Sequence, residues 1–413
     1  MRKIMSSLDV GNDTIKLVVG EMFKDKLYVL ATTEVKSEGI SKNVITDEEK
    51  LSSAISKAFD IVNDKLGMKV NKTIVIVPSK NAEFTIGEAK ISINNEDHII
   101  TGRDITNAIT ESYTGVVQDN MEMVNCIPAG FKLDNGSQYR NPLNKVSNYL
   151  EVRSVIITAP KSSVYPILSI LERLEIDVVD IAIDSLGDYY TYKDDGLDKY
   201  NGAIVNIGYN KTTVSIYSKG IITNVSLIEL GTNNIDKDIS YVYKIPIEES
   251  KDLRINYGIL SAKSSLLNDV LELDNIGNKT VNVPLQEVSK IIYSRLEEIL
   301  KMVKKEINTL TKKNINYIIF TGGSVETKNF KLVMDDVFSK NAVIGKIDTI
   351  GTRNNKYSSA IGLIKWYNNI QKLKDRDYSI FDIDEQSKLS GALKSDFGKD
   401  SSIISKVFDY FFE

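Results

Sequence analysis

Apolar residues along this chain recur at two spacings, every second residue and every third or fourth, and the switch between them outlines strands and helices. Apolar runs at residues 4–10, 15–21 and 27–33, separated by polar turns, predict three strands. Between residues 46 and 67, a helical spacing begins at a TDEE capping pattern and ends at a glycine, which predicts a helix. The continuous apolar run at 73–77 is typical of a buried strand.

The alternation of strands and helices is interrupted once and then resumes, which divides the chain. Residues 82–155 mix short alternating strands with one helix and polar turns, so we interpret them as an inserted α+β subdomain. A second series of strands begins at residue 203, and 413 residues are enough for more than one core. We therefore expect a first lobe at residues 1–81 and 156–188, the inserted subdomain at 82–155, a second lobe at 189–373, a flexible linker at 374–400 and an amphipathic helix at 401–413.

The last residues of the chain carry a strongly one-sided apolar pattern. At about 100° per residue, six large apolar side chains fall on one half of a helical wheel, opposite Lys406, Asp409 and Glu413. These six are Ile403, Ile404, Val407, Phe408, Phe411 and Phe412. Such a helix needs a cover, and the polar linker favours a membrane surface or a partner's groove over the protein's own body.

Composition and charge remove several classes of function. The chain is 42% hydrophobic and 26% charged, as in soluble globular proteins, and no window reaches the roughly 18 apolar residues of a transmembrane helix. Without a signal-peptide pattern, any membrane contact is expected to be peripheral. A net charge of -4 argues against broad nucleic-acid binding. A single cysteine, Cys126, and a single histidine, His98, argue against an internal disulfide, a Ser-His-Asp triad and a zinc site.

The most informative feature is a short motif that occurs twice. Residues 8–14 (LDVGNDT) and 205–211 (VNIGYNK) each run from an apolar strand through Asp or Asn and then Gly into a polar turn. Either motif alone is an ordinary hairpin, but the matched pair, with a TGGS turn at 321–324, favours phosphate binding by two facing loops. Glycine lets the backbone approach a phosphate, and the N–H groups of a turn point at its oxygens.

These elements resemble the nucleotide site of the actin, sugar-kinase and heat-shock-chaperone ATPase superfamily, and within it the chain resembles the FtsA family. The resemblance covers essentially the whole chain. Its motifs are IPAGFKLD at 127–134 with NPL at 141–143, VNIGYN at 205–210, IFTGG at 319–323 and YSSAIGL at 357–363. It implies a two-lobed actin-like ATPase fold of the α/β class, built from duplicated ribonuclease-H-like domains, with an inserted FtsA-type subdomain.

The resemblance also assigns residues to a site for ATP. It implies two phosphate loops, an adenosine pocket and a helix that reaches the ribose and base. The first loop would contain Gly11, Asn12, Asp13, Thr14 and Lys16, the second Gly208, Tyr209, Asn210, Lys211 and Thr212, the pocket Gly322, Gly323 and Ser324, and the helix Lys251 and Arg254. A carboxylate at a strand end can hold hydrated magnesium, so Asp9 is the candidate for Mg²⁺ through water.

Asn206 is a departure from the superfamily pattern. Many superfamily ATPases carry Asp at this position, whereas an amide adds no negative charge and cannot accept a proton as a base. Asp9 and Asn206 are the candidates for a catalytic role, and we expect ATP hydrolysis to be slow at most.

For function, the resemblance implies an ATP-binding cell-division protein that forms actin-like filaments on the cytoplasmic side of the membrane at the septum. It would bind the acidic C-terminal peptide of the tubulin-like protein FtsZ, tether FtsZ filaments through the amphipathic helix and assemble other division proteins. Arg295, on a helix predicted at 285–310, is the candidate for the peptide carboxylate.

Three other functions stay open at this point. A PilM-like adaptor of pilus assembly, a small-molecule kinase of the same superfamily and a plasmid-segregating filament would all carry a similar nucleotide site. The amphipathic tail argues against each of them, and Asn206 argues against the kinase because phosphoryl transfer to a hydroxyl needs a base.

Overall fold

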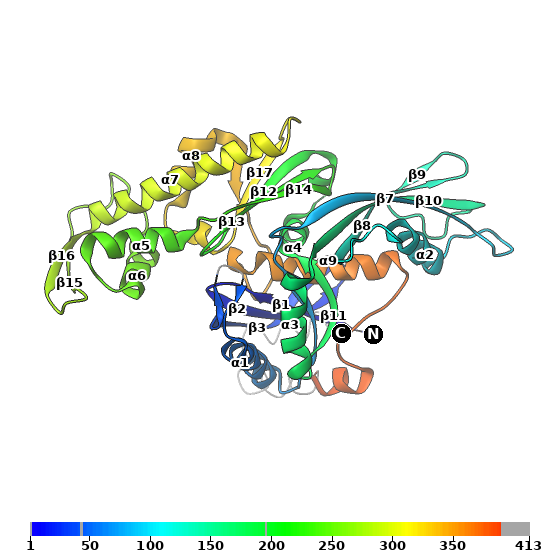
Figure 1. Cartoon of the computed structure of the whole chain (residues 1–413), viewed down its shortest axis with the longest axis horizontal. Coiled ribbons are helices and arrows are strands. Elements are labelled where there is room, and N and C mark those ends of the chain that lie inside the picture. The colour runs from blue at the N-terminus through cyan, green and yellow to red at the C-terminus, as the bar shows by residue number, and fades with distance from the viewer. Residues whose placement is uncertain (1, 42–43, 195, 390–413) are drawn as a thin grey trace.

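Two five-stranded sheets with equivalent strand orders form the body of this computed structural model, which describes residues 2–41, 44–194 and 196–389 (Figure 1). In each sheet, three antiparallel strands are extended by two strands that run parallel to the first of them. The first sheet has the order β11 (Asp177–Ile183), β6 (Lys72–Val77), β1 (Lys3–Val10), β2 (Thr14–Phe23) and β3 (Lys26–Lys36). The second has the order β18 (Ala342–Ile344), β17 (Tyr317–Thr321), β12 (Asn201–Ile207), β13 (Thr212–Ser218) and β14 (Ile221–Ile228). The second lobe therefore repeats the first.

Helices on the first lobe follow from caps and apolar spacing. The side chain of Asp47 caps α1 (Glu48–Leu66), and Gly67, in a left-handed conformation, ends it. Apolar residues at helical spacing, including Leu51, Ile55 and Phe59, bury one face of α1 against β2 and β3. Helix α3 (Lys161–Arg173) packs beside α1, and a short hairpin of β4 (Ile40–Ser41) and β5 (Val44–Ile45) precedes α1.

The second lobe is covered by a group of helices around the long α7. This helix and its neighbours share one apolar core with the second sheet. The group comprises α5 (Thr232–Tyr243), α6 (Ile247–Tyr257), α7 (Leu285–Leu310) and α8 (Phe330–Phe338), with a hairpin of β15 (Val270–Asp274) and β16 (Thr280–Pro284) at its outer end (Figure 1).

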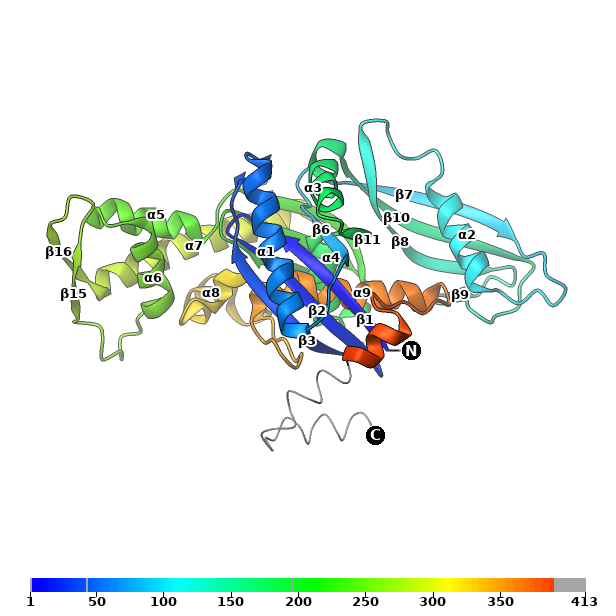
Figure 2. The ribbon, with the colours of Figure 1, turned by 90° about the horizontal axis from the view of Figure 1, so that it is seen from below.

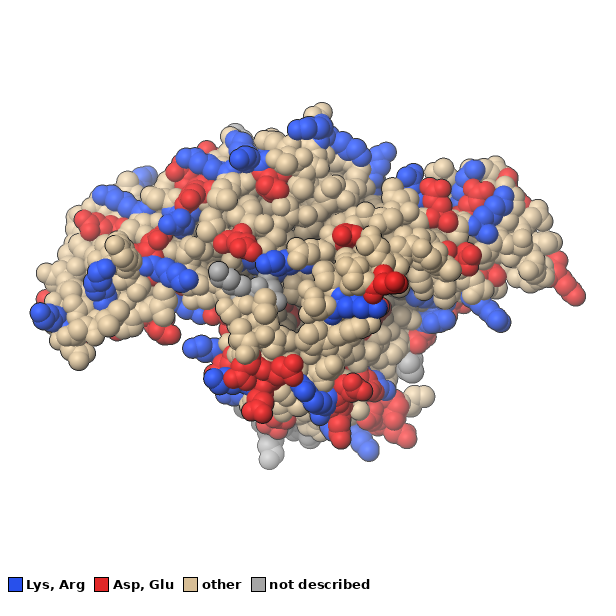
Figure 3. Space-filling model, in the orientation of Figure 1, with Lys and Arg blue, Asp and Glu red and all other residues tan. Residues whose placement is uncertain are grey.

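The inserted segment forms a separate small sheet with a core of its own. Its strand order is β7 (Glu83–Ser92), β10 (Tyr149–Pro160), β8 (Met121–Leu133) and β9 (Gln138–Tyr139), and α2 (Gly102–Tyr113) packs on the sheet. Figure 2 shows this subdomain and the α5–α7 group at opposite ends of the long axis of the molecule. On the face in Figure 3, acidic and basic side chains are interspersed rather than gathered into a field of one sign.

Two helices join the lobes by crossing in backbone contact. Where α4 (Asp184–Tyr192) meets α9 (Ser358–Leu373), a Cβ atom added to Gly362 would overlap the carbonyl oxygen of Gly187. The crossing therefore requires glycine at both positions. Buried residues of both sheets, such as Met5 and Ile204, belong to one core together with residues of α4 and α9.

The start of the expected flexible linker is instead packed on the first lobe. The backbone N–H of Ile380 donates to the carbonyl oxygen of Ile4 at 2.9 Å, and residues 383–389 are helical. Ile380, Phe381 and Leu389 are buried in the first-lobe core. The prediction of a linker from 374 is thus wrong as far as 389, because a few widely spaced apolar residues anchor an otherwise polar segment. Residues 390–413, which include the predicted amphipathic helix, lie outside the described residues.

The helix crossing makes a direct prediction about stability. Gly362→Ala forces α4 and α9 apart and should lower the free energy of unfolding by about 1–3 kcal/mol, the usual cost of overpacking. Gly130→Ala makes the same substitution where a Cβ atom meets only the carbonyl oxygen of Tyr139, at 3.9 Å, so it is the matched control and should change stability little. Equal melting temperatures for both variants and the wild type would mean that the helices do not cross in contact.

Candidate functional site

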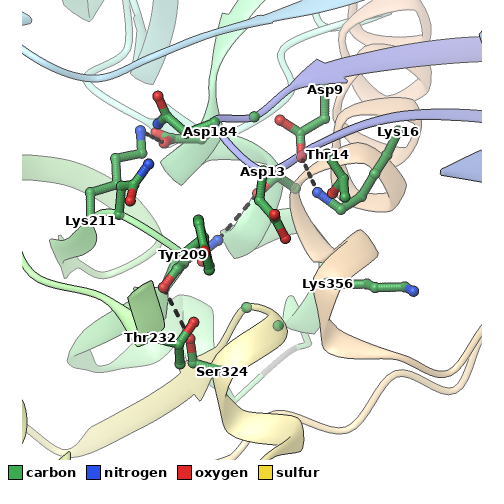
Figure 4. A pocket seen from close by; sticks show the side chains of 18 of the residues that line it. Asp9, Asp13, Thr14, Lys16, Asp184, Tyr209, Lys211, Thr232, Ser324 and Lys356 are labelled. Carbon is green, nitrogen blue, oxygen red and sulfur yellow. Dashed lines mark hydrogen bonds and ion pairs between the residues drawn. The ribbon is translucent and has the colours of Figure 1, made fainter. Parts of the chain in front are cut away.

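A cleft of about 540 Å³ lies between the two lobes and is lined by both of them (Figure 4). The first lobe supplies the β1–β2 turn and the start of α4, and the second lobe supplies the β12–β13 turn, α6 and the turn after β17. Within the part of the chain that the structure describes, none of the helices is long and apolar enough to cross a membrane.

The repeated motifs form the same turn in both lobes. The N–H of Gly11 donates to the carbonyl oxygen of Thr14 at 3.1 Å, and the N–H of Gly208 donates to that of Lys211 at 2.8 Å. In register, Asp9 pairs with Lys16 across the first hairpin, as Asn206 pairs with Thr213 across the second. The two lobes therefore present equivalent glycine turns to one cleft.

A third glycine turn follows β17 and meets the second hairpin. Gly322 has φ 91°, and a Cβ atom at this position would lie 2.6 Å from the carbonyl oxygen of Ile207. Only glycine fits both constraints. The hydroxyl of Ser324 donates to the carbonyl oxygen of Gly208 at 3.0 Å, which fixes the third turn against the second hairpin.

Three lysines of the second lobe reach across the cleft to carboxylates of the first-lobe side. Lys251 Nζ lies 3.0 Å from both carboxylate oxygens of Asp13, and Lys211 Nζ lies 3.1 Å from Asp184. The third pair joins Lys356 to Glu34. These ion pairs link the lobes at the site where the glycine turns converge.

Burial and these lysines shift the pKa values of the carboxylates in the cleft in opposite directions. Burial raises the pKa of Asp184, but the Lys211 ammonium and hydrogen bonds outweigh it and hold the pKa below its usual range. Burial likewise raises the pKa of Glu34, and Lys356 outweighs it to leave the pKa lowered. Both groups are therefore ionised at neutral pH.

Asn206 is hydrogen-bonded to Asp188, a buried acid that does not line the cleft. Its amide nitrogen donates to Asp188 Oδ2 at 2.8 Å, while the hydroxyls of Ser358 and Ser359 donate to Asp188 Oδ1 at 2.6 and 2.8 Å. Burial raises the pKa of Asp188 to about 7, and the nearby Asp184 adds to the rise.

Most residues that the sequence assigned to an ATP site line this cleft. They are Asp9, Gly11, Asn12, Asp13, Thr14, Lys16, Asn206, Gly208, Tyr209, Asn210, Lys211, Lys251, Arg254, Gly322, Gly323 and Ser324. The guanidinium of Arg254 is occupied, since Nε and one terminal nitrogen bind both carboxylate oxygens of Asp236.

Thr212 lies outside the cleft, contrary to its assignment. Its side chain is buried, and its hydroxyl donates to the carbonyl oxygen of Leu230 at 2.8 Å. Thr213 lines the cleft instead, because successive side chains of a strand point to opposite faces.

Several residues that line the cleft were not predicted from the sequence. Asp184 and Glu34 supply carboxylates, and Lys356 and Thr232 supply a cation and a hydroxyl. Asp184 has a local signal, because it directly follows a mostly apolar stretch at 178–183 that is typical of a strand, and the Asp and Asn of the repeated motif also lie at the ends of apolar strands. Glu34 and Lys356 had none, because they come together only in the folded chain.

The donor set around Asp9 suits magnesium bound mainly through water. Asp9, at the end of β1, and Asp13, in the β1–β2 turn, both line the cleft, and Lys16 Nζ lies 3.4 Å from Asp9. Among the described residues, no three His, Cys, Asp or Glu side chains gather into a metal-binding group. Magnesium that accompanies a nucleotide typically takes one or two carboxylates, phosphate oxygens and waters, so this arrangement fits.

Arg295 lies on a second, shallower surface between α5 and α7. Two hydrogen bonds of 2.7 and 3.1 Å join its guanidinium to Asp238, and a third of 2.6 Å joins it to Glu298. The same surface carries Tyr241 and Val242, which are 75% and 53% exposed. Arg295 is thus a paired residue at the edge of an exposed apolar patch.

Solved structures with this fold define the class. The chain resembles a PilM–PilN type IV pilus biogenesis complex with TM-score 0.58 and 10% identity, over 87% of this chain and 97% of that chain. It resembles MreB5 of Spiroplasma citri bound to ADP with TM-score 0.56 and 13% identity, over 90% of this chain and 99% of that one. With its duplicated lobes and inserted subdomain, the protein has an actin-like α/β fold, as predicted.

Sequence comparison narrows the class to one family. The family model "Cell division protein FtsA" matches residues 203–362, and "SHS2 domain inserted in FTSA" matches residues 80–158. FtsA of Bacillus subtilis is 28% identical over 87% of this chain and 82% of its own length, and FtsA of Borreliella burgdorferi is 27% identical over 97% and 99%. The chain belongs to the FtsA family of cell-division proteins.

Proposed function

We propose that this cell-division protein binds ATP with magnesium between its lobes and uses the bound state to form filaments that attach FtsZ to the membrane at the septum. The observation that carries the nucleotide site is the convergence of two equivalent glycine turns and the Gly322 turn on one cleft. Backbone N–H groups of such turns bind phosphate oxygens. The fold neighbours from Spiroplasma citri are described as bound to ADP and to AMPPNP, which supports the same ligand class here.

Within the cleft, the proposed roles follow from position and charge. Lys16 and Lys251 are the ammonium groups beside the first turn and would bind phosphate oxygens. Asp9 would hold the magnesium ion through water, and the ion would supply charge neutralisation of the phosphates. Slow ATP hydrolysis, expected from the amide at Asn206, stays a prediction.

Gly323 offers a clean test of the nucleotide site. It lines the cleft, and a Cβ atom there meets only the Cβ of Lys356, at 3.6 Å, so Gly323→Val should fold while filling the cleft. Calorimetric titration should show ATP binding at least about tenfold weaker than in the wild type, a loss of about 1.4 kcal/mol.

Gly130→Val is the matched control, because it adds the same side chain in β8 of the inserted subdomain, where a Cβ atom meets only the carbonyl oxygen of Tyr139, at 3.9 Å. Its ATP affinity should equal that of the wild type. If Gly323→Val also keeps full affinity, the nucleotide lies elsewhere.

The surface between α5 and α7 is the proposed site for the acidic C-terminal peptide of FtsZ. Tyr241 and Val242 offer exposed apolar contacts, and Lys290 and Arg295 lie on the same surface. Because Asp238 and Glu298 already hold Arg295, a peptide carboxylate must either share this guanidinium or bind Lys290.

Charge reversal and truncation separate these contributions. Lys290→Glu and Tyr241→Ser should each weaken binding of the FtsZ peptide about tenfold, since hot-spot contacts usually cost 1–2 kcal/mol or more. Lys301→Glu changes the same charge on α7 outside this surface and should have no effect. Fluorescence anisotropy with a labelled peptide measures all three, and equal affinities would place the partner site elsewhere.

Membrane attachment is proposed for residues 403–412, which lie outside the described part of the chain. The described chain ends at Leu389, buried in the first lobe, so the tail starts from that lobe. Residues 390–402, thirteen in number, separate Leu389 from this segment and can span at most about 45 Å, so a membrane-bound tail would keep the first lobe near the membrane. One short helix binds weakly, and a filament that holds several tails together would bind tightly.

Two aspartates on the apolar face should abolish this attachment. Phe408→Asp with Phe411→Asp should remove the protein from sedimenting liposomes while ATP binding persists, because charges do not enter the acyl boundary. Ser402→Asp with Ser405→Asp adds the same charge outside the apolar arc, opposite its centre and beside its edge, and should reduce lipid binding less. If the phenylalanine variant co-sediments as well as wild type, a partner groove is the better account of the tail.

A further inference from the structure

Asp188 is a buried acid that makes no direct contribution to the cleft, yet its hydrogen bonds reach a residue that lines it. Asp188 is 2% exposed and does not line the cleft, whereas Asn206 does. The 2.8 Å hydrogen bond between them joins α4 to the end of β12, at the base of the second glycine turn.

The direction of this hydrogen bond fixes the orientation of the amide. Asp188 accepts this hydrogen bond from the amide nitrogen of Asn206, so the amide oxygen faces away from Asp188. The oxygen indeed lies beside Gly322, because a Cβ atom at Gly322 would overlap Asn206 Oδ1. Gly322 lines the cleft, so a neutral hydrogen-bond acceptor is turned toward the third glycine turn.

Asp188 itself cannot move without breaking contacts with several elements. The hydroxyls of Ser358 and Ser359, at the start of α9, hold its other oxygen, and the adjacent Gly187 is fixed by the helix crossing. The groups that face Asp188 are Asp184 and Tyr192 on α4, Asn206 on β12, Tyr217 on β13, and Ser358 and Ser359 on α9. The acid is thus a rigid anchor.

We propose that Asp188 is a positioning residue, which anchors the amide nitrogen of Asn206 and so keeps its carbonyl oxygen directed at the cleft. This rests on the proposed nucleotide site, where such an acceptor suits a metal-bound water rather than a phosphate oxygen. It also gives a reason for the amide at position 206. A carboxylate there would lie against the Asp188 carboxylate, and two like charges in contact within a buried site repel.

The test compares ATP affinity with magnesium and with EDTA at pH 8, where Asp188 is ionised. Asp188→Leu and Asn206→Ala should each cut the gain in affinity from magnesium about tenfold, the effect of one hydrogen bond to a charged partner. Asp188→Asn retains an oxygen that accepts from the amide and should preserve the gain. Ser358→Ala removes another hydrogen bond to Asp188 without touching Asn206, so it should lower only the melting temperature.

The double variant decides whether Asp188 acts through Asn206. Asp188→Leu combined with Asn206→Ala should lose no more of the magnesium gain than Asn206→Ala alone, since residues that act as one unit are not additive. Additive losses, or a normal gain in Asp188→Leu, would overturn the proposal.

A second test measures melting temperatures without nucleotide. It depends neither on the proposed function nor on whether Asp188→Leu folds. In Asn206→Asp, two adjacent carboxylates repel each other and retain a shared proton to a higher pH than in the unfolded chain, so the folded-state pKa of the pair is raised and stability falls as pH rises. The melting temperature should lie well below that of wild type at pH 8, and this gap should narrow toward pH 5.5. A gap that is absent or constant with pH would show that Asp188 and Asn206 are not in contact. If the wild type does not bind ATP, the proposed nucleotide site is refuted. The melting temperatures then test the contact between Asp188 and Asn206 by themselves.

Discussion

The close crossing of α4 and α9 is the constraint on which the rest of the structure depends. Without side chains at Gly187 and Gly362, the two helix backbones touch, and the start of α9 comes to lie against Asp188. Both lobes are then fixed to this pair of helices. On the first lobe, the Ser7 hydroxyl donates to the carbonyl oxygen of Ala360, and on the second the Tyr192 hydroxyl bonds to Thr321. The position of each glycine turn relative to the other follows from this arrangement.

Electrostatics adds a second link between the lobes, at the mouth of the same cleft. Lys251, Lys211 and Lys356 each reach from the second lobe to a carboxylate on the opposite side. Two of these pairs, Lys251–Asp13 and Lys356–Glu34, are partly exposed, and such pairs contribute little stability one by one. The helix crossing therefore carries most of the connection. An anionic ligand in the cleft would compete with the carboxylates for these three lysines.

Turns and strands that are encoded by a few neighbouring residues could be predicted from the sequence. The repeated motif predicted two hairpins, and the structure gives both the same turn, from Gly11 to Thr14 and from Gly208 to Lys211. The Thr212 assignment was wrong by one residue, because the sequence does not fix which face of β13 points to the cleft.

Residues whose place depends on distant parts of the chain could not be predicted in this way. Asp188 lies in a helix with no motif, and its role depends on serines about 170 positions later. The segment anchored by Ile380 and Phe381 has the polar composition of a linker, and its few apolar residues are buried only in the assembled core of the first lobe. In both cases the missing information is tertiary contact.

Hydrogen exchange of the backbone amides, with and without magnesium and ATP, tests the central claim of two equivalent turns around one nucleotide. If both lobes bind the same ligand, ATP should slow exchange at residues 10–14, 207–211 and 321–324 together, at one shared ligand concentration. Protection confined to one lobe, or none at any of the three turns, would contradict this account.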